Sequence, residues 1–164
     1  MPACGEGHLG KFFNLLGEHS TYGGNFDLKE VLQLLSVAFE QGSVIVFVSD
    51  FLGNKFSVKD YEDSFKILAK KFDLISVILR DPRDEFMPDQ DANIVVSDPY
   101  TNQSVFFNVK KIKKQYEEYN KEHKENLVKF FKNINSEHLE LYCHEPFVKP
   151  TIAFFKRRDA LFSR

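Results

Sequence analysis

The sequence predicts an α/β protein of three layers, in which helices cover a short parallel sheet. Two apolar runs, Val44–Val48 and Leu74–Leu79, lack regular polar alternation, which is typical of strands covered on both faces in parallel sheets. Between them, apolar residues at helical spacing predict an amphipathic helix over Val58–Phe72. A strand, a helix and a strand in this order form a βαβ unit. The two strands should therefore be parallel neighbours joined by a right-handed crossover.

A helix directly before the first strand is indicated by its capping residues. Asp27 is a typical N-cap residue, and Glu30 follows it at the spacing of a capping box. Apolar residues then recur at every third or fourth position, and Gly42 is expected to end the helix as its C-terminal cap. A further helix is expected around His8–Leu16.

The part of the chain after the second strand predicts a β-hairpin inserted into the α/β pattern. Residues 81–91 are polar and contain two prolines, so we expect a surface loop there. Two β-rich runs separated by turn residues follow, and then a long amphipathic helix, a third parallel strand and a final helix. The ranges are Asn93–Ser97 and Gln103–Asn108 for the hairpin, Val109–Ile134 for the long helix, His138–Cys143 for the strand and Phe147–Arg157 for the final helix. We expect residues 1–164 to form a single domain.

Charge and cysteine content exclude several classes of protein. The 22 basic and 24 acidic residues leave a net charge of −2, whereas nucleic-acid binders usually carry a basic surplus. No apolar stretch approaches the roughly 20 residues needed to cross a bilayer, and the N-terminus lacks the apolar core of a signal peptide. Cys4 and Cys143 lie far apart in sequence, which favours a reducing compartment. We therefore expect a cytoplasmic protein that binds neither nucleic acid nor a membrane.

Several motifs of chemical interest have simpler structural interpretations. The glycines at positions 5, 7 and 10 match a dinucleotide fingerprint, but no strand is predicted before them, and Phe12 stands where a phosphate loop needs Ser or Thr. Cys143 and His144 are neighbours on a predicted strand, so their side chains should point to opposite faces. The basic cluster Lys110–Lys114 is interpreted either as a solvated helix face or as a surface for an acidic partner.

Two aspartates are the remaining candidates for chemistry. Asp50 and Asp81 each follow a predicted buried strand, at the carboxyl edge of the sheet where ligands bind in open α/β folds. Asp50 is a candidate magnesium ligand, phosphoryl acceptor or general base, and equally a loop-capping residue that accepts hydrogen bonds from backbone amides. Asp81 precedes a proline, which favours a turn, and Arg80 or Arg83 is expected to neutralise it.

Four motifs taken together resemble a known family. They are GSVIVFVSDF, the helix ending LAKKFDLISVILRDPRDEFMP, the hairpin VVSDPYTNQSVFFNV and the closing TIAFFKRR. In this order they resemble the carboxyl-terminal half of a von Willebrand factor A-like domain. The version they resemble belongs to a prokaryotic family of unassigned function found alongside MoxR-type AAA ATPases. The resemblance covers about residues 5–158 and implies a Rossmann-type, truncated three-layer fold with an inserted hairpin.

The resemblance also implies a metal-ion-dependent adhesion site whose last position is Asp50. The defining Asp-x-Ser-x-Ser motif is absent from this sequence, and Asn25 stands where a threonine is expected. A hard cation requires several oxygen ligands, so we expect no tightly bound cofactor, with magnesium at Asp50 as the only candidate. We also expect the half-domain that carries the missing motif to have been lost or to lie outside this chain.

A non-enzymatic protein-interaction module is the function expected from these observations. In a complete domain, a strand of the first half would pair beside Val44–Val48. Without that strand, Val44–Val48 becomes an apolar sheet edge that is available to pair with another chain. The expected partners are a second copy, the missing half-domain or an AAA ATPase, for which the chain would act as an adaptor. The alternative is a magnesium-dependent phosphoryl-transfer or receiver-like protein that uses Asp50. The residues of the expected interaction rim are Ser49, Asp50, Phe51, Asp81 and Arg83.

Overall fold

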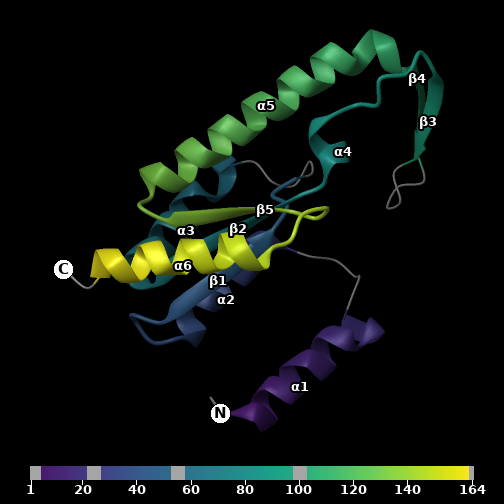
Figure 1. The fold of residues 1–164 in the computed structure, drawn as a ribbon. Coiled ribbons are helices and arrows are strands. Elements are labelled where there is room, and N and C mark those ends of the chain that lie inside the picture. Colours follow the sequence, from purple (N-terminus) through teal and green to yellow (C-terminus); the bar gives the residue numbers. More distant parts are fainter. Residues whose placement is uncertain (1–4, 22–26, 53–57, 98–102, 163–164) are drawn as a thin grey trace.

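The protein contains a three-stranded parallel sheet with helices on both of its faces (Figure 1). The computed structural model describes residues 5–21, 27–52, 58–97 and 103–162. The strands are β1 (Val44–Ser49), β2 (Asp73–Arg80) and β5 (Glu137–Tyr142), in the spatial order β1-β2-β5. Both pairings are parallel, which confirms the predicted α/β class and all three predicted parallel strands.

Helices α2, α3 and α5 pack on one face of the sheet, and α6 packs on the other (Figure 1). Their bounds are α2 Leu28–Ala38, α3 Val58–Lys71, α5 Val109–Asn133 and α6 Val148–Phe162. On the first face, apolar residues of α2, α3 and α5 surround Ile45, Leu74 and Ile78 of the sheet. On the second face, Phe154 of α6 packs against Ile75 and Leu139. Because successive residues of a strand face opposite sides, one sheet supplies both cores.

Phenylalanine rings form the centre of the larger core. Phe131 of α5 lies between Phe51, which follows β1, and Phe65 of α3, with ring centroids 5.3 and 6.3 Å away. Phe130 is 5.2 Å from Phe131, and all four of these side chains are at most 4% exposed. Edge-on ring contacts of this kind add to the stabilisation from burial of apolar surface. They couple α3 and α5 to the end of β1.

Asp27 begins α2 as predicted, but Gly42 does not end it. The Asp27 carboxylate accepts hydrogen bonds from the backbone N–H groups of Lys29 (2.8 Å) and Glu30 (3.4 Å). The helix ends at Ala38, and Gly42 lies in the following turn with φ +85°. Glycine adopts this left-handed conformation without the steric cost that a Cβ atom imposes. Gly42 therefore turns the chain into β1 rather than capping α2.

The predicted loop 81–91 contains a short helix, α4 (Pro82–Glu85). The Asp81 side chain accepts from the Arg83 N–H at 2.8 Å, and the Asp84 side chain accepts from the Asp81 N–H at 3.1 Å. Proline at the first helical position has a favourable φ and no N–H to satisfy. Asp81, Pro82 and Asp84, which contributed to the loop prediction, thus form the N-terminus of a four-residue helix.

The predicted hairpin is confirmed and lies at the far end of α5 from the sheet (Figure 1). Strands β3 (Asn93–Ser97) and β4 (Ser104–Asn108) pair antiparallel. Asn108 then caps α5 by accepting a hydrogen bond from the Lys111 N–H at 3.2 Å. Apolar side chains remain exposed on this hairpin, for example Phe106 at 68%.

Helix α1 (Glu6–Gly17) lies apart from the sheet and buries none of its residues (Figure 1). A short 3-10 helix, η1 (His19–Thr21), follows it. Gly7 and Gly10 lie within the helix, so the glycine motif forms neither a dinucleotide fingerprint nor a phosphate loop. Leu9, Phe12 and Phe13 are more than half exposed, so this helix presents apolar side chains to solvent.

The prediction that β1 is covered on both faces is wrong for the described residues. Ile45 is buried on the side of α2, but Val44, Val46 and Val48 on the opposite face are 60%, 50% and 55% exposed. The same prediction is correct for β2, where Ile75 and Ile78 face opposite sides and are each 1% exposed. Helix α6 covers β2 and β5 but does not reach the valines of β1.

His138 on β5 makes the stability of the fold depend on pH. Its ring stacks on Phe131 at 6.1 Å, and burial lowers its pKa, an effect that nearby Glu140 opposes and Lys132 and Arg157 reinforce. The unfolded chain therefore binds the proton more readily than the folded one. The contribution of neutral His138 to stability is present above the usual histidine pKa and is lost as the pH falls below it.

We expect the loss of unfolding free energy between pH 7.5 and pH 5.5 to be smaller in His138→Gln than in the parent protein. Urea titrations at the two pH values measure this difference. His8→Gln, on the exposed helix α1, is the matched control. An equal loss in the parent and His138→Gln proteins would contradict the role of His138.

Candidate interaction surface at the carboxyl edge of the sheet

The turn after β1 exposes Asp50 and buries Phe51. The Phe51 N–H donates to the Ser49 Oγ at 3.1 Å, and the Leu52 N–H donates to the Asp50 Oδ1 at 3.1 Å. Phe51 has φ +54° and is 1% exposed, an uncommon conformation for a non-glycine residue. The carbonyl O of Phe51 lies 3.0 Å from the Nε2 of His123, so α5 contacts the turn through this side chain. His123 thus stabilises the edge of the sheet.

Asp81 lies at the same edge, at the end of β2, and acts as a helix cap. Its carboxylate accepts from the Arg83 N–H, and the Arg83 carbonyl accepts from the Tyr116 hydroxyl at 2.8 Å. The expected neutralisation of Asp81 by an arginine side chain is not observed. Within the described ranges no ion pair joins Asp81 to Arg80 or Arg83, and the Arg80 Nε instead lies 3.5 Å from Glu140.

The described residues do not fit a magnesium site at Asp50. One Asp50 oxygen already accepts from Leu52, and the Ser49 Oγ lies 3.5 Å from the same oxygen. No group of three or more His, Cys, Asp or Glu side chains within the described ranges is placed to hold a metal. Magnesium requires near-octahedral oxygen coordination, which one carboxylate does not supply. Asn25, which stands where the resemblance implies a threonine, lies outside the described residues.

A buried arginine supports this edge of the sheet. Arg80, the last residue of β2, is 3% exposed, and its Nη1 donates to the Asp50 carbonyl at 3.4 Å. A buried guanidinium requires a compensating charge, which Glu140 of β5 supplies. Arg80, at the end of β2, therefore links the turn after β1 to Glu140 of β5.

Lys124 of α5 extends this ion-pair network to α4. Its Nζ lies 2.9 Å from Glu140, 3.0 Å from Glu85 and 2.7 Å from the hydroxyl of Tyr142. Burial alone would lower the pKa of Lys124, but hydrogen bonds to Tyr142, Glu140 and Glu85 outweigh it and raise the pKa. Lys124 is therefore a permanently charged structural group rather than a general base.

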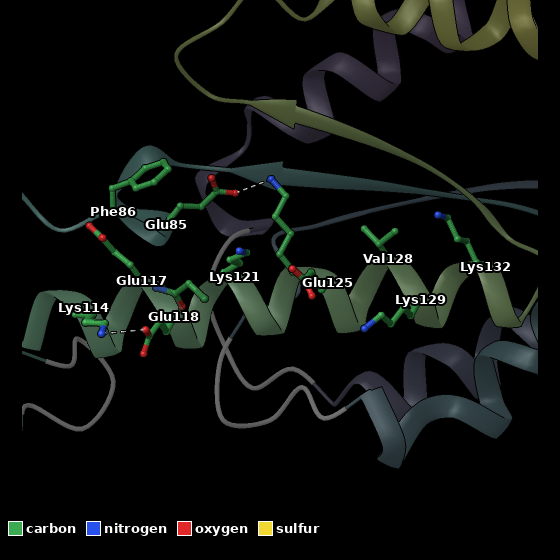
Figure 2. Close-up of a pocket in the computed structure, with 12 residues that line it drawn as sticks. Glu85, Phe86, Lys114, Glu117, Glu118, Lys121, Glu125, Val128, Lys129 and Lys132 are labelled. Carbon is green, nitrogen blue, oxygen red and sulfur yellow. Dashed lines mark hydrogen bonds and ion pairs between the residues drawn. The ribbon is translucent and has the colours of Figure 1, made fainter.

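A groove of about 790 Å³ runs between α4 and the outer face of α5. Figure 2 shows Glu85 and Phe86 opposite α5, with a dashed ion pair reaching Glu85 from α5. The lining side chains of α5 are mostly lysines and glutamates, which are interspersed along the helix: Lys114, Glu117, Glu118, Lys121, Lys124, Glu125, Lys129 and Lys132. Opposite charges neutralise one another along this groove, so its electrostatic potential favours neither an anionic nor a cationic ligand.

The basic cluster and the cysteine–histidine pair have structural environments that the sequence did not reveal. Lys113 pairs with Asp89 at 2.9 Å, and Lys110 lies 3.7 Å from Asp91, so acidic residues before the hairpin neutralise half of the cluster. Strand β5 ends at Tyr142, and Cys143 and His144 lie exposed in the following turn instead of on a strand. No catalytic pairing follows from either arrangement.

The outer edge of β1 presents unpaired backbone groups. Val44 is in register with Asp73, and the Asp73 N–H donates to the Ser43 carbonyl at 3.0 Å. In a parallel ladder this pattern directs the C=O group of Ser43 and the N–H and C=O groups of Ile45 toward β2. Alternation then directs those of Val44, Val46 and Val48 away from the sheet, along the side on which no described strand pairs.

The fold and this edge together define an α/β protein whose parallel sheet has polar turns and a buried ion-pair network at its carboxyl end. A family model described as "Protein of unknown function DUF58" matches residues 2–126. The chain belongs to this family. No curated protein and no solved structure matches the chain. Among the described residues, no helix combines the length and the apolar character needed to span a membrane.

Proposed function

We propose that the chain is a non-enzymatic protein-interaction module. The observation that carries this proposal is the uncovered, apolar edge of β1, where Val44, Val46 and Val48 are at least half exposed. An apolar edge with unpaired backbone groups is a template for pairing with another chain. The aspartates at the carboxyl edge support the same interpretation, because Asp50 and Asp81 accept hydrogen bonds from the backbone that hold turns.

In its more specific form, the proposal makes the chain a von Willebrand factor A-like adaptor for an AAA ATPase in the cytoplasm. The motif order in the sequence supports this form, and the rim contact would comprise Ser49, Asp50, Phe51, Asp81 and Arg83. Asp50, Asp81 and Arg83 are exposed, while Phe51 anchors the rim to the core. An exposed free thiol at Cys143 fits a reducing compartment.

Titration of the labelled protein with a purified MoxR-type AAA ATPase from the same organism tests the proposal. The double variant Asp81→Asn, Arg83→Glu changes the charge of the rim but keeps an oxygen to cap α4. We expect saturable binding by the parent protein and an at least tenfold weaker affinity for the double variant. Lys156→Glu, an exposed change on α6, should bind like the parent protein.

Two results would overturn this proposal in favour of the phosphoryl-transfer or receiver-like alternative. One is a heat of magnesium binding in calorimetry that disappears in Asp50→Ala. The other is uptake of phosphate from a small phosphodonor at Asp50. Among the described residues, no group of three or more His, Cys, Asp or Glu side chains is placed to hold a metal, which gives that alternative no support.

A further inference from the structure

We infer that β1 pairs antiparallel with β1 of a second copy of this chain. The pairing has a twofold axis at Val46 and joins the two three-stranded sheets into one of six strands. This inference rests on the proposed interaction role of β1 and deepens it, because it names the partner and the register. The occupant is a strand because a packed helix would cover the valine side chains but leave the edge N–H and C=O groups unpaired.

The directions of the backbone groups determine the register. The outward N–H and C=O groups belong to Val44, Val46 and Val48, so these residues must face their counterparts in hydrogen-bonded pairs. An axis at Val46 places Val44 opposite Val48 of the second copy and engages the whole strand. If the register shifted by one residue, the outward N–H and C=O groups of one β1 strand would lie opposite residues of the other β1 strand whose groups point toward their own β2. Shifts of two or more would leave part of the edge unpaired.

The sequence of β1 is complementary to itself in this register. Its six residues, VIVFVS, include no charge and no proline, which are the usual devices that prevent edge strands from pairing. Three valines from each copy meet as cross-strand neighbours on the uncovered face, and pairs of β-branched residues favour sheet formation. Asp50 lies opposite Gly42 of the second copy, so like charges do not meet at the ends of the strand.

Apolar surface near β1 is not confined to the three valines. Leu34 and Val37, which lie on one side of α2 before β1, are 62% and 79% exposed and add apolar surface outside the valine face.

Cysteine cross-linking at the axis tests both the pairing and its register. In a Cys4→Ser, Cys143→Ser background, Val46→Cys places two thiols in one hydrogen-bonded pair, with Cα atoms about 5.5 Å apart. That separation permits a disulfide. Val44→Cys is the matched control, because its own counterpart lies four residues along the strand, about 14 Å away. We expect Val46→Cys to form the disulfide dimer at least tenfold faster than Val44→Cys under the same mild oxidant.

Sedimentation provides a measurement that is independent of cysteine. We expect the parent protein to sediment as a dimer, and Val46→Lys, which places two positive charges together at the axis, as a monomer. Val95→Lys, at an exposed valine of the hairpin, should remain a dimer. A parent protein that stays monomeric at high concentration, or equal cross-linking of the two cysteine variants, would overturn the inference.

Hydrogen exchange distinguishes failure of the inferred β1–β1 pairing from failure of the proposed interaction function. In a monomer whose amides at Val44, Val46 and Val48 exchange rapidly, the edge is open, and a different partner can still bind it. Slow exchange at these amides in a strict monomer would mean that the chain covers its own edge. That result would remove the observation on which the proposed function rests.

Discussion

Phe131→Ala is expected to lower the free energy of unfolding by about 3–5 kcal/mol, the usual cost of removing a buried phenylalanine ring. The Phe131 side chain is 0% exposed and lies within 5.3 Å of the Phe51 and Phe130 rings. No neighbouring backbone can close the cavity easily, because the side chains around it come from a strand end and two helices. Equilibrium urea unfolding followed by circular dichroism measures the change.

The effect of Phe131→Ala should extend to the turn that carries Asp50. Phe51 adopts φ +54°, and such left-handed residues cost of order 1–2 kcal/mol unless surrounding contacts hold them. Removing the ring that packs on Phe51 weakens one of those contacts. We therefore expect faster amide exchange at Phe51 and Leu52 in this variant, in addition to the global loss of stability.

Phe106→Ala is the control for this prediction. Phe106 is 68% exposed on the hairpin, and substitutions at such surface positions usually change stability by less than about 0.5 kcal/mol. A loss in Phe131→Ala no larger than that in Phe106→Ala would show that the phenylalanine cluster is not the centre of the core.

Arg158→Ala is expected to cost about 2–3 kcal/mol and to loosen α6. Arg158 is 5% exposed, donates to both Asp73 carboxylate oxygens and also pairs with Glu137. Breaking a fully buried ion pair costs about 3–5 kcal/mol. The two carboxylates here are 38% and 33% exposed, and water screens them once Arg158 is absent, so the expected cost is lower.

Two further variants separate the charge of Arg158 from its packing. Arg157→Ala removes the neighbouring arginine, which is 62% exposed and 3.6 Å from Glu137, and should change stability little. Arg158→Met keeps an apolar stem against Phe154 and removes the charge. Chemical denaturation of the three variants gives the comparison. Arg158→Met as stable as the parent protein would show that the ion pairs contribute nothing to the attachment of α6.

Local patterns predicted most of the secondary structure because their causes are local. Asp27 lies where the capping rule placed it, and Asn93–Ser97 is the strand that its β-rich composition predicted. The helix expected over Val109–Ile134 is observed with its end changed by one residue. The errors are also local and physical. Gly42 predicts a helix end because glycine serves both caps and turns. The segment with Pro82 predicts a loop because proline favours both loops and the first turn of a helix.

The candidate site was predicted only in part. The sequence placed Asp50 and Asp81 at the carboxyl edge, since each follows an apolar run, and the structure places both there. The ion-pair network beneath them was not predicted. A signal for it existed in Arg80, a charge that directly ends a buried run. However, Glu140, which pairs with Arg80, and Lys124, which pairs with Glu140, lie 60 and 44 positions further along the chain, and no local pattern connects such distant residues.

The sequence by itself determined that this protein is an α/β protein with buried parallel strands, because apolar runs, helical spacing and capping residues act over a few neighbouring positions. The resemblance implied that β1 is a sheet edge, but only the tertiary structure decided that one face of β1 is bare. Burial of a strand depends on which distant segments pack on it, and Val44–Val48 has the same composition whether or not they do. The tertiary structure also assigned Asp50 and Asp81 to backbone capping, because a carboxylate binds whichever donors the fold brings within hydrogen-bond distance.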